Sequence, residues 1–137
     1  PARRVSRAPR PERGTIVPTI LVVDDDADVA NVISDMLTTR GYRVLTETEP
    51  GEAIRLVDAG RDPIDLLVTD IVMRGMHGHE LAESLRDRWP RMKVLFMTGY
   101  PAEELRNHRV PLFGARVLTK PLAVDTVVDA VRGILGA

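Results

Sequence analysis

The chain has 137 residues, of which 44% are apolar and 28% charged, and these proportions are ordinary for a single globular domain. It contains no cysteine, which excludes disulfide bonds, thiolate metal sites and cysteine nucleophiles. No apolar run approaches the roughly 18 residues of a membrane span, and no signal-peptide pattern follows the basic N-terminus. We therefore expect a cytoplasmic protein with no membrane partner.

The net charge of −1 is unevenly distributed along the chain. Residues 1–14 contain five arginines against one glutamate, together with three prolines and almost nothing apolar. Such a segment cannot bury enough surface to order itself, so residues 1–16 are predicted to be a flexible Arg/Pro-rich tail or linker. A nucleic-acid-binding arm is the alternative, but aromatic interleaving and helical periodicity are missing. Residues 17–137 are the predicted folded domain.

From residue 17 onward, short apolar runs alternate with segments whose apolar residues recur at helical spacing. In chain order, strands are predicted over 20–23, 42–46, 66–69, 94–97 and 116–119. Helices are predicted over 29–37, 50–60, 81–89, 101–109 and 124–135, the last with the clearest apolar stripe (Val124, Val127, Val128, Val131, Ile134 and Leu135). Asp26 and Asp28 are expected to cap the first helix.

Five strands that alternate with helices predict an α/β fold, a doubly wound parallel sheet with about five helices on both faces. Ligands of such sheets bind beyond the carboxyl ends of the strands, where the strand order reverses. The polar residues of this chain gather at those ends. Asp24 and Asp25 follow the first strand, and Asp70 ends the third. Thr98 ends the fourth strand and Lys120 follows the fifth.

Several carboxylates at one sheet edge raise one another's pKa unless a cation offsets them. Hard oxygen ligands without histidine or cysteine favour Mg²⁺ over zinc. Such a site suits phosphoryl transfer, in which the metal neutralises phosphoryl oxygens and a carboxylate can act as the nucleophile. Lys120 is suited to supply a point charge and Thr98 a hydrogen bond to a phosphoryl group.

Four motifs stand at these strand ends in order: I-L-V-V-D-D-D at 20–26, D-I-V-M at 70–73, M-T-G-Y at 97–100 and L-T-K-P at 118–121. Over residues 18–137 the chain resembles the receiver domains of two-component signalling. The resemblance implies the flavodoxin-like strand order 2-1-3-4-5. It further implies a domain that catalyses its own phosphorylation and dephosphorylation, without being a classical turnover enzyme.

By this resemblance Asp70 is the phosphoacceptor. Mg²⁺ is then bound directly by Asp25, Asp70 and the backbone carbonyl of Val72, while Asp24 acts mainly through water. The phosphoryl-binding and switching residues implied by the resemblance are Thr98 and Lys120, with a cis peptide bond before Pro121.

The resemblance also implies partners. The phosphoryl donor is a sensor histidine kinase, a histidine phosphotransfer domain or a small acyl phosphate, and the fourth helix, fifth strand and fifth helix change their surface for a downstream protein. A homodimer through that surface is a further option. The basic linker and the L-F-M-T-G-Y stretch at 95–100 favour the receiver of a hybrid sensor kinase, with a free-standing regulator as the alternative. No DNA-binding pattern follows within this chain.

Several positions depart from the family pattern and are candidate modulators of the switch and of the lifetime of the phosphorylated state. Arg74 stands where the family commonly has proline, and we expect it to reach a phosphoryl oxygen or an acidic group of a partner. Val117 replaces the usual aromatic residue of the fifth strand, so Tyr100 is the candidate moving aromatic group. Val72 and Tyr100 flank the path of attacking water, and neither activates it, which predicts a long-lived phosphorylated state.

Two other functional classes compete with this interpretation. An aspartate-nucleophile hydrolase usually has a second acid two residues after the nucleophile, where this chain has Val72. A phosphorylation-independent interaction module on the same fold is the alternative function, although every reactive position is filled. His77 and His79 lie two residues apart in a Gly-rich loop, where a weak metal site is the alternative, and they are interpreted as solvated loop side chains. Gly75 and Gly78 are interpreted as turn residues.

Overall fold

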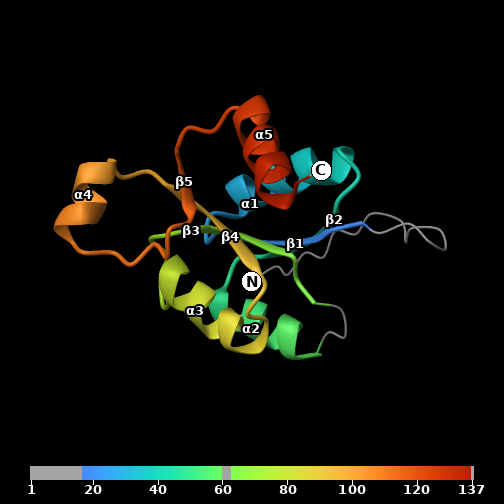
Figure 1. Ribbon diagram of the computed structural model, residues 1–137, viewed down its shortest axis with the longest axis horizontal. Coiled ribbons are helices and arrows are strands. Elements are labelled where there is room, and N and C mark those ends of the chain that lie inside the picture. The colour runs from blue at the N-terminus through green and yellow to red at the C-terminus, as the bar shows by residue number, and fades with distance from the viewer. Residues whose placement is uncertain (1–16, 60–62, 137) are drawn as a thin grey trace.

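A computed structural model describes residues 17–59 and 63–136 (Figure 1). The predicted tail, residues 1–16, lies outside the described residues. The strands are β1 (Thr19–Val23), β2 (Arg43–Glu47), β3 (Leu66–Asp70), β4 (Lys93–Thr98) and β5 (Arg116–Thr119). The helices are α1 (Ala27–Thr39), α2 (Pro50–Ala59), α3 (Gly78–Arg88), α4 (Ala102–Asn107) and α5 (Val124–Leu135).

The five strands form one parallel sheet in the order β2-β1-β3-β4-β5, which confirms the predicted fold class. The register pairs Val23 with both Glu47 and Thr69, and Asp70 with Met97. Because the strands are parallel and nearly in step, their carboxyl ends finish at one edge of the sheet. β1 and β3 lie side by side at the centre of the sheet, although α1, β2 and α2 separate them in the sequence. The strand order therefore reverses between β1 and β3, beside Asp24 and Asp70.

The sheet is covered on both faces, which explains the continuous apolar runs in its central strands. In Figure 1, α1 and α5 lie above the sheet, while α2 and α3 lie below it. Successive residues of β1 point to opposite faces: Ile20 and Val22 pack with α1 and α5, whereas Leu21 and Val23 pack with α2 and α3. All four are fully buried.

Helix α1 begins at the predicted cap. The Asp26 side chain accepts hydrogen bonds from the backbone N–H groups of Asp28 (3.0 Å) and Val29 (3.3 Å). These bonds satisfy donors that have no partner within the helix. The cap therefore fixes the direction in which the chain leaves Asp24 and Asp25 at the end of β1.

Helix α4 is short and is displaced from the rest of the molecule, at the left of Figure 1. Leu105 is its buried residue. The predicted stripe of α5 needs one correction, because Val124 is 45% exposed. Val124 is the first residue of α5 and precedes the turn that packs on the sheet. Across residues 17–59 and 63–136, no helix has the length and apolar character that a bilayer crossing requires.

Candidate functional site

Three carboxylates meet at the reversal point of the sheet. One ligand oxygen each from Asp24, Asp25 and Asp70 lies within 4.8 Å of the other two. The exposed fraction of Asp24 is 0% and that of Asp70 is 9%. Asp25, whose side chain is 26% exposed, forms the outer wall of the site. Asp24 and Asp25 directly follow β1 and Asp70 ends β3, two strands that the crossover connections make neighbours.

Lys120 links two of these carboxylates. Its Nζ donates hydrogen bonds to Asp24 Oδ2 at 2.8 Å and to Asp70 Oδ2 at 3.0 Å. The backbone N–H of Lys120 donates to the Thr98 carbonyl at 2.7 Å. The Lys120–Pro121 peptide bond is cis. Lys120 is therefore held at both backbone and ammonium, with its charge between the acids of β1 and β3.

Burial and pairing shift the titration of these groups in different ways. Burial raises the pKa of Asp24 above its ordinary 3.8, and the hydrogen bonds from Lys120 and from the Asp26 N–H offset only part of this effect. Burial alone would lower the pKa of Lys120, but its hydrogen bonds to Asp24 and Asp70 raise it above 10.5. Desolvation dominates at Asp24 because no part of Asp24 is exposed, whereas Lys120 keeps 23% of its side chain exposed.

Thr98 lies at the end of β4 and is 1% exposed. Its Oγ1 accepts a hydrogen bond from the Tyr100 N–H at 2.9 Å. Tyr100 itself is 42% exposed, and the chain from there enters α4 within two residues. The Thr98 hydroxyl is thus coupled directly to the segment that leads into α4. Val117 pairs with the fully buried Phe96 in the adjacent strand.

Gly78 is a site residue whose role the sequence did not reveal. It is the first residue of α3, not a turn residue, and its N–H donates to the Ile71 carbonyl at 2.8 Å. A Cβ on Gly78 would lie 2.0 Å from the Asp70 carbonyl oxygen. Only glycine lets α3 begin this close to the backbone of Asp70. A glycine in a polar loop gives no sequence signal that separates this role from an ordinary turn.

Arg74 contacts Asp25 from the β3–α3 loop. Its backbone N–H donates to Asp25 Oδ2 at 3.2 Å, and its Nε lies 3.7 Å from the same oxygen. The Arg74 side chain is 92% exposed. Arg74 therefore faces the acidic cluster itself, a contact that its position in the sequence did not predict.

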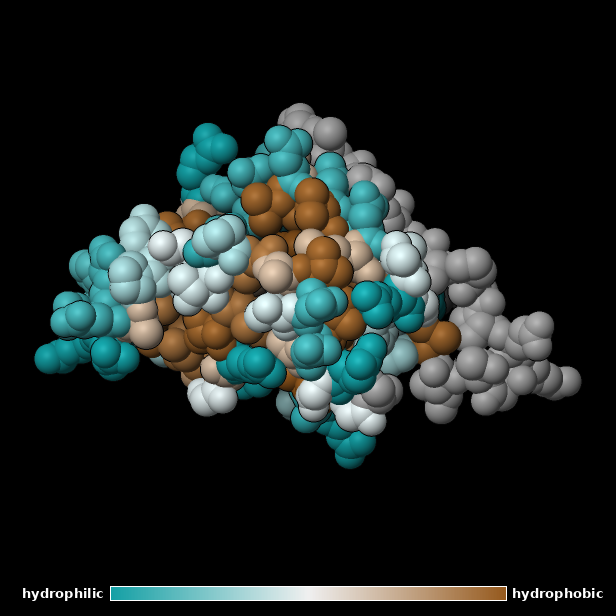
Figure 2. All heavy atoms as spheres, turned by 90° about the horizontal axis from the view of Figure 1, so that it is seen from above, coloured by the Kyte–Doolittle hydropathy of each residue, from teal (hydrophilic) through white to brown (hydrophobic). Residues whose placement is uncertain are grey.

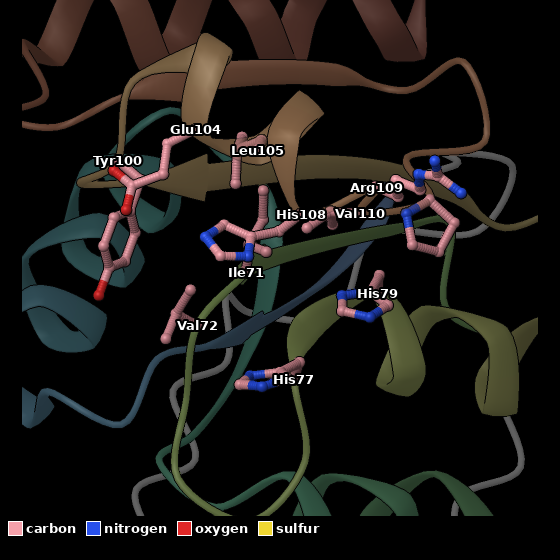
Figure 3. A pocket seen from close by; sticks show the side chains of 11 residues that line it. Ile71, Val72, His77, His79, Tyr100, Glu104, Leu105, His108, Arg109 and Val110 are labelled. Atoms are coloured by element: carbon pink, nitrogen blue, oxygen red, sulfur yellow. The ribbon is translucent and has the colours of Figure 1, made fainter.

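A hollow of about 460 Å³ adjoins the site between α3 and α4 (Figure 3). Val72 and Tyr100 line one end of this hollow, and the imidazoles of His77, His79 and His108 line it together with residues of α4 and the segment that follows α4. The prediction of a solvated loop side chain needs correction for His79, which lies in α3 and is half-buried. Its Nδ1 is buried and has no hydrogen-bond partner within the described residues. Burial lowers the pKa of His79. His77 Nδ1 instead accepts from the Met73 N–H at 3.4 Å.

Comparison with known proteins identifies the family. The sequence profile of the response regulator receiver domain matches residues 20–132. The chain belongs to the response regulator receiver family. The receiver region found in this way contains every strand-end residue described above. The predicted resemblance is confirmed at the level of the family.

Several individual proteins of this family are similar to the chain over most of its length. The response regulator receiver protein CpdR of Brucella abortus is 32% identical over 116 residues, which cover 85% of this chain and 95% of CpdR. The receiver domain of the hybrid histidine kinase CckA is 30% identical with a TM-score of 0.72, covering 85% of this chain and 98% of that domain. By contrast, the chain spans only 24% to 49% of the length of three longer curated regulators that it matches.

The site has the donor chemistry of a magnesium site. Three carboxylates converge without cysteine, and hard oxygen ligands of this kind suit Mg²⁺. The response regulator TrrA of Thermotoga maritima, whose structure is a complex with Mg²⁺ and BeF, matches this receiver with 26% identity and a TM-score of 0.73. That match covers 86% of this chain and 99% of TrrA. The residues present therefore fit the cation that the family implies.

Proposed function

We propose that this receiver takes a phosphoryl group from a phosphohistidine onto Asp70 in a Mg²⁺-dependent reaction. The observation that carries the proposal is the position of Lys120. Its ammonium joins Asp70 to Asp24 across the site, at 3.0 and 2.8 Å. The Lys120 ammonium already lies where the negative charge of an aspartyl phosphate on Asp70 would form. It can therefore stabilise that charge without moving far.

In the proposed reaction a carboxylate oxygen of Asp70 attacks phosphorus and forms the aspartyl phosphate, while the phosphorus–nitrogen bond of the donor breaks. The donor imidazole leaves with the electron pair of that bond. Asp24, Asp25, Asp70 and the Val72 carbonyl are the proposed metal-binding groups, with Asp24 acting mainly through water. Mg²⁺, when bound, neutralises charge on the transferring phosphoryl oxygens.

Lys120 and Thr98 supply the remaining contacts in this proposal. The Lys120 ammonium moves its hydrogen bond from Asp70 to a phosphoryl oxygen, and the Thr98 hydroxyl donates to another. If Thr98 Oγ1 turns toward the phosphoryl group, the Tyr100 N–H loses its present acceptor. Because α4 holds to the body mainly through Leu105, this loss is expected to shift the surface of α4, β5 and α5. Val117 leaves no aromatic group on β5, so Tyr100 takes that part.

The biological setting is proposed from the family and the relatives. Residues 17–137 form the receiver and residues 1–16 a linker or tail, and the domain works in the cytoplasm. A sensor histidine kinase or a histidine phosphotransfer domain supplies the phosphoryl group, and a downstream protein, or a second copy bound through α4, β5 and α5, reads the change. The 30% identity to the CckA receiver supports a hybrid-kinase setting, and the coverage of CpdR supports a free-standing one.

Intact mass tests the proposal directly. The protein is incubated with acetyl phosphate, and separately with a phosphorylated histidine phosphotransfer domain, with and without Mg²⁺. We expect a gain of one phosphoryl group that requires Mg²⁺ and is absent from Asp70→Asn. If folded protein binds Mg²⁺ and yet gains no phosphoryl group from either donor, the phosphorylation-independent interaction module becomes the better function.

A further inference from the structure

Each of the three clustered carboxylates has a cationic neighbour. Lys120 serves Asp24 and Asp70, and Arg74 serves Asp25. Both cations face the oxygens on which a divalent metal depends. The two cations differ in exposure and in the length of their contacts with these oxygens.

Lys120 is a fixed partner, whereas Arg74 is a replaceable one. The Lys120 side chain is 23% exposed and makes two hydrogen bonds of 3.0 Å or less. The Arg74 side chain is 92% exposed, and its Nε lies 3.7 Å from Asp25 Oδ2, which is beyond good hydrogen-bond length. The firm contact between these residues is the backbone N–H of Arg74, which donates to the same oxygen at 3.2 Å.

We propose that the Arg74 guanidinium competes with Mg²⁺ for Asp25 and so sets the affinity of the receiver for its metal. This inference rests on the proposed metal site. The backbone N–H orients the Asp25 carboxylate whatever the side chain is, so the guanidinium contributes charge and not position. A positive charge beside a dication repels it, and it also partly neutralises the carboxylate that attracts the dication. Removing the guanidinium should therefore tighten Mg²⁺ binding.

The size of the effect follows from exposure. An exposed charge acts through water and is screened by salt, so its influence is modest. We expect Arg74→Ala to lower the Kd for Mg²⁺ roughly two- to fivefold at low ionic strength. The difference should shrink toward none near 1 M of a monovalent salt, where the Debye length is about 3 Å. Arg74→Lys keeps a positive charge and should stay close to the wild type.

Arg55 provides a matched control. It lines the same open cavity as Arg74 and Asp25, and its side chain is 79% exposed. Its guanidinium pairs with Glu52 at 3.4 Å rather than with Asp25. Arg55→Ala removes the same charge from the same cavity and should leave the affinity for Mg²⁺ nearly unchanged.

Isothermal titration with Mg²⁺, at low and high salt, is the test. It uses the wild type, Arg74→Ala, Arg74→Lys, Arg55→Ala and Asp25→Asn, with melting temperatures to show that each is folded. Tighter binding in Arg74→Ala alone, lost at high salt, supports the inference. Unchanged binding in Arg74→Ala overturns it, and weaker binding overturns it in favour of a guanidinium that positions Asp25. The proposed metal site fails separately if the wild type binds no Mg²⁺ or if Asp25→Asn binds as well as the wild type.

Discussion

Gly78→Ala should damage the fold and the site together. The new Cβ would lie 2.0 Å from the Asp70 carbonyl oxygen, 2.9 Å from its carbon and 3.1 Å from the Ile71 Cα. Ordinary contact begins at 3.4 Å, so α3 and the end of β3 must separate by 1.4 Å, the difference between 3.4 and 2.0 Å. Overpacking of this kind costs about 1–3 kcal/mol, and the higher helix propensity of alanine returns at most about 1 kcal/mol. We expect a net loss of up to about 3 kcal/mol.

The same separation moves the backbone of Asp70. A displacement near 1 Å at a reacting group can lower a rate by roughly a hundredfold, so phosphorylation by acetyl phosphate should slow ten- to hundredfold. Urea unfolding followed by circular dichroism measures the first effect, and intact mass against time measures the second.

Gly133→Ala is the matched control. Gly133 lies in α5 with nothing within 4 Å of its Cβ position, so alanine should stabilise by about 0.5–1 kcal/mol and leave the phosphorylation rate unchanged. The two glycine-to-alanine substitutions should thus change the free energy of unfolding in opposite directions. If Gly78→Ala proves as stable and as reactive as the wild type, the close approach of α3 to Asp70 does not constrain the site.

Three further outcomes can be measured. Burial raises the pKa of Asp24, so the native state holds that proton more tightly and the stability linked to this carboxyl falls as pH rises above 3.8. Asp24→Asn should therefore have a larger free energy of unfolding than the wild type at pH 7 without Mg²⁺, and this difference should become smaller toward pH 3. A stability gain that is the same at both pH values would contradict this cause. Val32, 53% exposed on α1, lines an apolar groove that reaches Lys120 and Leu122. Figure 2 looks down on the side of the sheet covered by α1 and α5, where hydrophobic residues gather near the middle of the surface. A protein donor must cover the surface next to Asp70 when it transfers its phosphoryl group. Val32→Asp should therefore slow transfer from a phosphotransfer domain about tenfold or more and leave the rate with acetyl phosphate unchanged. Equal slowing with both donors would locate the defect in the site itself. The phosphorylated state should be long-lived, and Tyr100→Glu should shorten its lifetime by orienting water; a lifetime of seconds that Tyr100→Glu leaves unchanged would count against shielding by Tyr100 and Val72.

The order of the elements and the chemistry of the site could be read from the sequence. A run such as Ile20 to Val23 is apolar at every position because both faces of its strand are covered, and that requirement is visible without coordinates. The same holds for the acids that follow buried strands. In a parallel sheet every carboxyl end reaches the same edge, so Asp24, Asp25 and Asp70 were expected at one edge, and the structure brings them into one cluster.

Which atoms meet at that edge was decided only by the tertiary structure. Helical and strand periodicity determine which face of an element is buried, but they carry no information on how far one loop lies from another. The pairing of Arg74 with Asp25, the close approach of Gly78 to Asp70 and the burial of the His79 Nδ1 atom all depend on where the β3–α3 loop and the start of α3 pack. Those distances are set by the packing of α3 against the sheet as a whole, because non-local contacts fix the position of a loop that has no periodicity of its own.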